Sequence, residues 1–192
     1  MALVKTTGIA APSQSIGCVH STDEHADFVI CKEPSKLKAI LSAIGSGKQT
    51  HFVSDGDWSM HDLVMELLKI YKPAELFLST YALREYPVRQ LVLALDKGDL
   101  LSVSMVLDYR AKVRTPEVFE LANMNASKIF LTAIHAKVTV IRSTLGCVTI
   151  VGSQNWTTNP KIECGVISMD QQLAEFHINW LEKVMDNAEI FS

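Results

Sequence analysis

The order of apolar and polar positions along the chain predicts strands and helices that alternate. Short, largely apolar runs, such as 74–80 and 100–109, are typical of buried strands. The run 59–71 has apolar residues three and four apart, as an amphipathic helix does. The whole pattern predicts strands at 27–32, 50–55, 74–80, 100–109, 128–133, 136–142, 147–153 and 163–169, and helices at 35–44, 59–71, 83–98, 116–125 and 171–188.

This alternation indicates an α/β fold, a mixed central β-sheet flanked by helices on both faces. Residues 1–25 are rich in Ser, Thr, Gly and Ala and are expected to form a flexible N-terminal arm, and residues 26–192 a single domain. A chain of 192 residues is long enough to bury a substantial core.

The sequence shows neither a membrane-spanning segment nor a signal peptide, and this predicts where in the cell the protein is found. No apolar run reaches the roughly 20 residues that span a bilayer, and the start of the chain has no sustained apolar region like that of a signal peptide. The four cysteines form no Cys-x-x-Cys pair and are expected to be free thiols in a reducing compartment. We therefore expect a cytoplasmic protein with no membrane span.

The net charge of −3 argues weakly against a general nucleic-acid binder, but the charge is unevenly distributed. Between residues 110 and 163 there are seven lysines and arginines against three glutamates, a local net charge of +4. This basic stretch contains the residues with the clearest chemistry.

A histidine and a lysine stand two residues apart where the strand at 136–142 begins. Residues i and i+2 share one face of a strand, so His135 and Lys137 are expected side by side. If 136–142 and 147–153 form a hairpin, the start of the first strand and the end of the second meet at one end of the sheet. Asn155 would then converge on this pair, with Glu163 close by.

These four residues match the needs of phosphodiester cleavage. Lys137 can neutralise the non-bridging oxygens and Asn155 can donate a neutral hydrogen bond. A neutral His135 can attack phosphorus through a ring nitrogen, and a carboxylate on its other nitrogen, with Glu163 as the candidate, would fix the tautomer. No metal and no cofactor is needed, and the sequence has no acidic pair that looks built to hold a metal.

The run from His135 to Gly165 resembles the signature of the phospholipase D superfamily. It has His-x-Lys in "HAK", Gly-Ser-x-Asn in "GSQNWTTNPKIECG", and a Glu on the next strand. The resemblance implies a phospholipase D-like fold and a metal-independent, two-step mechanism through a phosphohistidine. It also implies two His-x-Lys motifs for each active site, whereas this chain has one.

A homodimer whose two His135 residues face each other is therefore implied. Small members with a single motif are typically nucleases, which makes DNA or RNA the expected substrate. Many members carry Asp five residues after the motif lysine, where this chain has Arg142. The candidates for substrate contact are Ser153, Thr157, Asn159, Arg142 and Trp156, the last by stacking on a base.

Other interpretations stay open. Ser79, Thr80 and Tyr81, at a strand end, are expected to border the same cleft. Trp156 is also explained as a packing residue. The alternatives to a nuclease are a catalytically silent nucleic-acid-binding or scaffold module with the same fold, and a phospholipid hydrolase.

Overall fold

The structure is a computed structural model that describes residues 26–31, 37, 40–41, 44–45, 49–56, 58–158 and 160–186. The expected N-terminal arm at 1–25 lies outside the described residues. Within the helix predicted at 35–44, Leu37, Ile40 and Leu41 are helical and Ile44 is not. The strands are β1 (Ala26–Cys31), β2 (Gln49–Asp55), β3 (Ala74–Thr80), β4 (Leu100–Asp108), β5 (Lys128–Thr132), β6 (Val138–Ser143), β7 (Gly146–Gly152) and β8 (Ile162–Ser168). The helices are α2 (Met60–Tyr71), α3 (Glu85–Asp96), α4 (Arg110–Arg114), α5 (Pro116–Asn125) and α6 (Gln171–Asp186).

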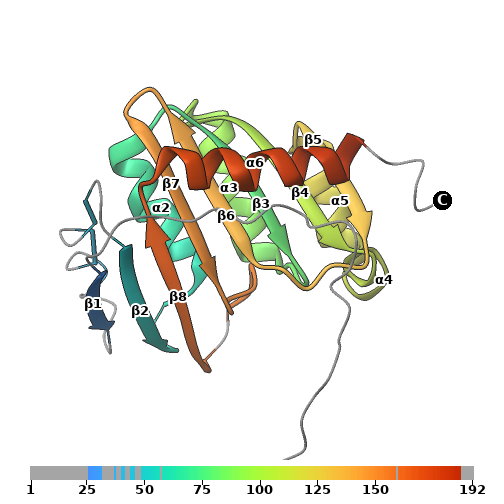
Figure 1. Cartoon of the computed structure of the whole chain (residues 1–192). Helices are drawn as coiled ribbons and strands as arrows, with labels where there is room; N and C mark the ends of the chain where they lie inside the picture. The colour runs from blue at the N-terminus through green and yellow to red at the C-terminus, as the bar shows by residue number, and fades with distance from the viewer. Residues whose placement is uncertain are drawn as a thin grey trace, which may run out of the picture.

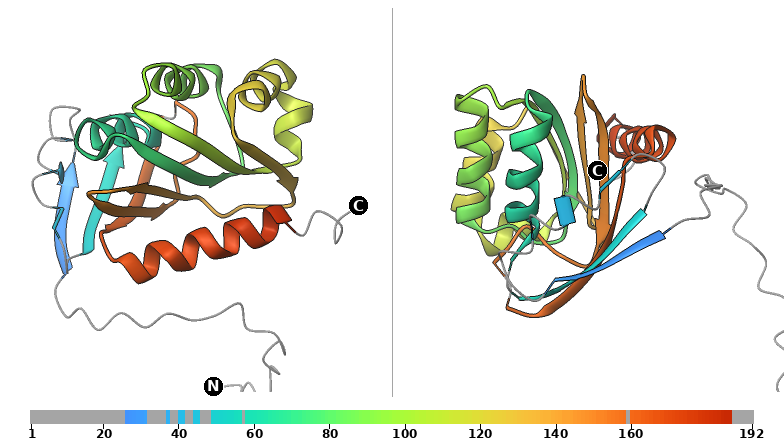
Figure 2. Two further views of the ribbon diagram at one scale, coloured as in Figure 1. Left: turned by 90° about the horizontal axis from the view of Figure 1, so that it is seen from above. Right: turned by 90° about the vertical axis from the view of Figure 1, so that its left-hand side faces the viewer.

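The described strands form one mixed sheet in the order β1-β2-β8-β7-β6-β3-β4-β5 (Figure 1). β3, β4 and β5 run parallel, whereas β6, β7 and β8 are antiparallel neighbours. Figure 2 shows α2, α3 and α5 on one face of the sheet and α6 on the other. The prediction of a mixed sheet flanked by helices on both faces is confirmed.

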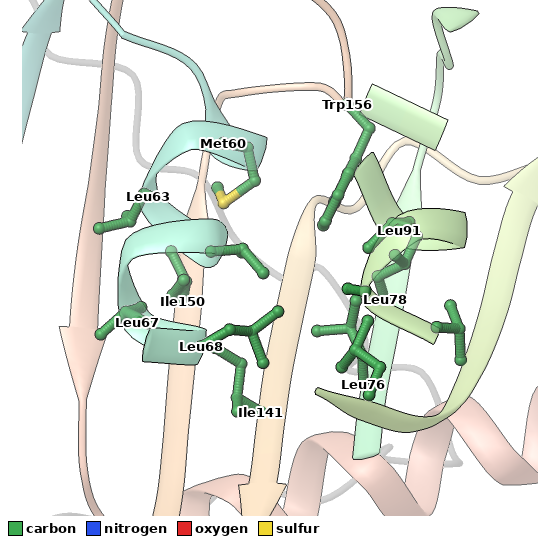
Figure 3. Close-up of a cluster of buried hydrophobic side chains, with 14 of the residues drawn as sticks. Met60, Leu63, Leu67, Leu68, Leu76, Leu78, Leu91, Ile141, Ile150 and Trp156 are labelled. Carbon is green, nitrogen blue, oxygen red and sulfur yellow. The ribbon is translucent and has the colours of Figure 1, made fainter. Parts of the chain in front are cut away.

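Each face of the sheet buries its own apolar cluster. Leu76, Leu78 and Ile141 pack under the helices of the first face, as Figure 3 shows. Phe77 and Val140, from the alternate positions of the same strands, pack against α6. Strands buried on both faces read as continuous apolar runs, which is why β3 and β6 were recognisable in the sequence.

Residues next to α2 in the sequence determine where this helix begins and ends. The backbone N–H of Ser59 donates to Asp62 Oδ2 at 2.9 Å, an N-terminal capping interaction. The helix ends at Tyr71, two residues before Pro73, because the residue before a proline disfavours helical backbone.

Two local departures from the predicted elements bear on the site. Helix α4 was not predicted, because its five residues include three basic side chains and too few apolar ones to show a period. Strand β6 begins at Val138, so His135 and Lys137 lie just before the strand rather than in it.

The predicted hairpin of β6 and β7 is confirmed by an antiparallel register that pairs Val138 with Val151. Beyond this pair the backbone N–H of Gly152 donates to the Lys137 carbonyl at 3.2 Å. On the other side, the N–H of Ser153 donates to the Cys164 carbonyl at 2.9 Å. The start of β6, the end of β7 and the start of β8 therefore meet at one end of the sheet.

Candidate active site

His135 and Lys137 lie together at this end of the sheet. The Lys137 Nζ atom is 3.4 Å from His135 Nδ1 and 3.5 Å from His135 Nε2. It donates a hydrogen bond to the His135 carbonyl at 2.8 Å. The histidine side chain is exposed, whereas Lys137 is only 8% exposed. The pair thus presents an accessible imidazole with a sheltered cation beside it.

The Lys137 ammonium lies in an environment that disfavours its charge. Burial lowers the pKa of Lys137, and the carboxylate of Glu163 partly opposes the shift. A buried cation of this kind gains from any anion that binds beside it. Its position is therefore suited to neutralising a phosphate oxygen.

Glu163 is held by the loop that follows β7. Ser153 Oγ donates a hydrogen bond to Glu163 Oε2, and the backbone N–H of Cys164 donates to Ser153 Oγ at 3.1 Å. The electrostatic contact with Lys137 brings this carboxylate into the site. Glu163 and Ser153 thus stand at the end of the sheet where the sequence predicted them.

Asn155 is fixed from the neighbouring strand β3. Thr80 Oγ1 lies 3.2 Å from Asn155 Oδ1, and the Ser79 Oγ atom accepts from the Val138 N–H at 3.2 Å. Because its oxygen faces Thr80, Asn155 keeps its amide N–H groups for another partner. Asn155, Thr157 and Glu163 border one narrow crevice. Of the residues 79–81 expected to border the cleft, Ser79 and Thr80 are buried and support the site from behind, whereas Tyr81 lines a pocket.

Tyr81 connects the histidine to a group of arginines. Its ring meets the His135 ring edge-on with centroids 5.2 Å apart. The Arg110 guanidinium lies 4.5 Å from the centre of the Tyr81 ring, and the Arg114 guanidinium lies 5.7 Å from it. Arg114 Nη1 also donates to the Tyr81 hydroxyl at 3.3 Å. Tyr81 thus lies between the His135 ring and the guanidinium groups of Arg110 and Arg114.

Asp108 is a buried carboxylate that sequence reasoning missed. It is fully buried at the end of β4. It accepts from Arg110 Nε at 2.7 Å, from Arg110 Nη2 at 3.1 Å and from the backbone N–H of Ile134 at 3.3 Å. The bonds from Arg110 hold the pKa of Asp108 below its ordinary value. The signal that could have revealed it is "DYRAKVR", an acid at the end of an apolar strand followed by a basic run.

Trp156 does not have the role expected for it at the substrate. Its side chain is 1% exposed, and its indole N–H donates to Thr139 Oγ1 at 3.3 Å. Figure 3 shows the ring directed into the core from the loop after β7. A ring buried this way cannot stack on a base, so stacking by Trp156 is corrected to packing. The alternative interpretation, a packing residue, is confirmed.

Arg142 is the second correction. It pairs in register with Glu75, whereas the site end of β6 pairs Val138 with Ser79. Its Nε donates to Glu75 Oε2 at 2.7 Å, and its guanidinium lies over the Phe77 ring at 4.8 Å. A five-residue offset along an extended strand places Arg142 at the far end from Lys137. The structure therefore does not bring Arg142 to the phosphate site.

One candidate residue, a metal site and a membrane span remain to be considered. Asn159 lies outside the described residues. Among the described residues, no group of three or more His, Cys, Asp or Glu is placed to hold a metal ion. Within the same part of the chain, no helix has the length and apolar character to cross a membrane.

The comparisons with known proteins bear on the fold. No family model and no curated protein matches the sequence. The fold is similar to that in the crystal structure of polyphosphate kinase from Porphyromonas gingivalis, with a TM-score of 0.55 and 13% sequence identity. The similarity covers 79% of this chain and 27% of that one, so this chain spans about a quarter of its length. TrmBL2, an archaeal chromatin protein with a novel mode of DNA binding, gives a TM-score of 0.46 at 11% identity, over 71% of this chain and 52% of that one.

Fold and site together define the class. This is an α/β protein with a mixed sheet, similar in fold to a polyphosphate kinase, that presents an exposed histidine and a buried lysine beside the end of a β-hairpin.

Proposed function

We propose that the protein is a metal-independent phosphodiesterase, specifically a nuclease, that acts through a phosphohistidine on His135 in a site shared by two copies of the chain. The observation that carries the proposal is the Lys137 ammonium, 8% exposed and next to an exposed imidazole. Burying a cation is costly unless an anion compensates it. A phosphate at His135 would supply that charge in addition to Glu163.

The proposed chemistry has two steps. A ring nitrogen of His135 attacks phosphorus, the bond to the leaving alkoxide breaks, and the partner subunit's His135 gives that alkoxide a proton. The same partner histidine then takes a proton from water, which attacks phosphorus and breaks the P–N bond. Lys137 and the amide of Asn155 stabilise the negative charge on the non-bridging oxygens in both steps.

Other parts of the molecule support this assignment. Ser153 and Glu163 hold the loop after β7 beside the lysine, and we propose Ser153 and Thr157 as substrate contacts. The net charge of +4 between residues 110 and 163 suits a polyanionic substrate. The polyphosphate kinase of similar fold acts, by its name, on phosphoryl groups. The resemblance in motif to the phospholipase D superfamily points to the same chemistry.

The test is cleavage by the purified protein in EDTA. Single- and double-stranded DNA, RNA and phospholipid vesicles are offered to wild type, His135→Ala, Lys137→Ala and the control Lys97→Ala, whose lysine is exposed at the end of α3. We expect wild type and the control to cleave nucleic acid, and both site variants to lose at least a thousandfold in rate.

Other outcomes of this assay would support a different function or contradict the mechanism. Cleavage of phospholipid alone would identify a lipid hydrolase, and binding of nucleic acid without cleavage would identify a silent module. Loss of activity in EDTA that a divalent ion restores would contradict metal independence. Full activity of His135→Ala would remove the histidine from the mechanism.

A further inference from the structure

A pocket next to the candidate active site is not explained by the chemistry at His135. It has a volume of about 370 Å³ and is lined by residues of three segments of the chain, within 81–84, 111–115 and 157–158. This is within the size range of small-molecule sites and much larger than a single phosphate. The lining residues are Tyr81, Ala82, Leu83, Arg84, Ala111, Arg114, Thr115, Thr157 and Thr158.

The pocket is connected to the site by two shared residues. Tyr81 lines the pocket and meets the His135 ring at 5.2 Å. Thr157 also lines it and borders the crevice that Asn155 and Glu163 share. A ligand in the pocket is therefore separated from His135 by one tyrosine ring.

The charges of the pocket favour an anion. Arg84 and Arg114 line it, and no carboxylate belongs to the lining. Within the described part of the chain, neither arginine has an ion-pair partner, whereas Arg110 nearby is bound to Asp108. Both guanidinium groups are exposed and so are available to a phosphate.

Two helix N-termini reinforce this preference. Arg84 is the N-cap residue of α3 and Thr115 is the N-cap residue of α5, and both line the pocket. Neither residue caps its helix through a side-chain hydrogen bond. Helix N-termini carry a partial positive charge and bind phosphate. The first-turn carboxylate of α3, Glu85, is occupied by Arg89 at 2.7 Å.

The rest of the lining is suited to more than phosphate. Tyr81 and Ala82, which are half-buried, add an aromatic ring and apolar surface, and the threonines add hydroxyl groups. An inorganic anion would use only the charges, whereas a nucleotide also carries a sugar and a base that need apolar and hydroxyl contacts.

We propose that this pocket binds the nucleotide next to the scissile phosphodiester, with its phosphate on Arg84 and Arg114 and its sugar and base against Tyr81 and Ala82. The proposal rests on the proposed nuclease function and adds to it a subsite for a second unit of the strand. The protein is then selective for a nucleic-acid chain over an isolated phosphodiester.

The binding test uses the full chain with His135→Ala, so that cleavage does not interfere. Fluorescence anisotropy with a labelled single-stranded hexanucleotide compares this protein with one that also carries Arg84→Gln and Arg114→Gln. The matched control carries Lys97→Gln, an exposed basic residue at the end of α3 outside the pocket. We expect the double change to weaken binding at least tenfold and the control to change it less than twofold. Equal binding by all three proteins would overturn the subsite.

The kinetic test uses proteins that retain His135. The double variant is assayed on the hexanucleotide and on bis(p-nitrophenyl) phosphate, which carries one phosphodiester and no second phosphate. We expect the loss in kcat/KM to be at least tenfold larger on the hexanucleotide. Similar losses on both substrates would mean that Arg114 acts by holding Tyr81 in place, and would overturn the proposal.

Two results separate this inference from the proposed function. If neither substrate is cleaved but the binding test succeeds, the nuclease function fails and the pocket remains a nucleotide site. If both are cleaved without any selective loss in the double variant, the pocket proposal alone fails. Competition by inorganic hexaphosphate as strong as that by the unlabelled hexanucleotide would show a phosphate-chain site and overturn the nucleotide assignment.

Discussion

At the scale of single residues, the site depends on a lysine whose charge the protein does not stabilise well. Lys137 is nearly buried, and burial outweighs the nearby Glu163 in setting its pKa below the ordinary 10.5. In the proposed mechanism the charged form binds the phosphate, and it does not contribute to the stability of the fold. Sites of this kind exchange stability for function.

We predict that Lys137→Met makes the folded protein more stable near pH 7 by about 1 kcal/mol. Below the lowered pKa the buried charge destabilises the fold, and Met fills similar space without a charge. The hydrogen bond lost from the His135 carbonyl can be replaced by water, because that residue is exposed. Urea unfolding measures the change, and a loss of stability would contradict this account.

The same lysine predicts an alkaline limit to activity. As the pH rises through the lowered pKa of Lys137, the ammonium loses its charge, and the bound phosphate loses its cationic partner. We therefore expect kcat/KM to fall at a lower pH than it would with an ordinary lysine. Between the lowered pKa of Lys137 in the folded protein and its ordinary pKa in the unfolded chain, the folded state binds fewer protons than the unfolded chain. Stability therefore rises with pH over the window in which activity falls. If stability and activity both fell over this pH range, a titrating group other than Lys137 would be responsible.

At the scale of elements, the Asp108 carboxylate connects β4, α4 and the segment before β6 through hydrogen bonds. Asp108 ends β4, binds the first residue of α4 and accepts from the backbone of the segment that carries His135. Similarly, β7 and β8 approach so closely that no side chain fits at Gly152. Both features hold the loops of the site in place.

We predict that Asp108→Asn costs about 1–3 kcal/mol of stability, because a buried charge-assisted network is lost. The exposed Asp186→Asn, whose side chain is 66% exposed, is the control and should cost less than about 0.5 kcal/mol. The folded pKa of Asp108 is lowered, so the wild-type advantage is complete above 3.8 and is lost as pH falls below it. Urea unfolding at pH 7 and pH 3 measures both effects, and an advantage that grows in acid would be inconsistent with the network.

We predict that Gly152→Ala destabilises the protein by about 1–3 kcal/mol and also lowers activity. An added Cβ would lie 2.7 Å from the Cys164 carbonyl oxygen and 3.2 Å from Gly165 Cα. Both are backbone atoms, so β7 and β8 must separate and carry Ser153 and Glu163 with them. Thermal unfolding and turnover test this, and an unchanged melting temperature would show that the strands can adjust.

At the scale of the whole molecule, one chain supplies one His-x-Lys pair. The proposed chemistry needs a nucleophile and a separate acid, so each chain would hold half a site. Chains of 21.3 kDa should therefore pair into a dimer of twice that mass. Light scattering measures the mass, and a strict monomer with full activity would refute the shared site.

Mixed dimers give the sharper measurement. A heterodimer of wild type and His135→Ala keeps one histidine, so it should form or resolve the intermediate only in part, and its rate should fall far below half that of wild type. Half the wild-type rate would indicate two independent sites instead.

Much of this molecule was determined by the sequence itself. Apolar runs in β3 and β4, and the capping pair of Ser59 and Asp62, specify their elements through local contacts, so the α/β fold and most boundaries were predicted correctly. The hairpin of β6 and β7 is also local, and it brought His135, Lys137 and Ser153 to one end of the sheet.

Tertiary structure alone decided which side chains reach that end. Trp156 and Arg142 match the chemistry of a substrate site, but the first is inserted into the core and the second is drawn to Glu75 on a neighbouring strand. Asp108 and Arg114 stand more than 20 residues before the motif and have no pattern that predicts their place beside it. Such contacts form only when distant strands pair, so residue spacing along the chain cannot reveal them.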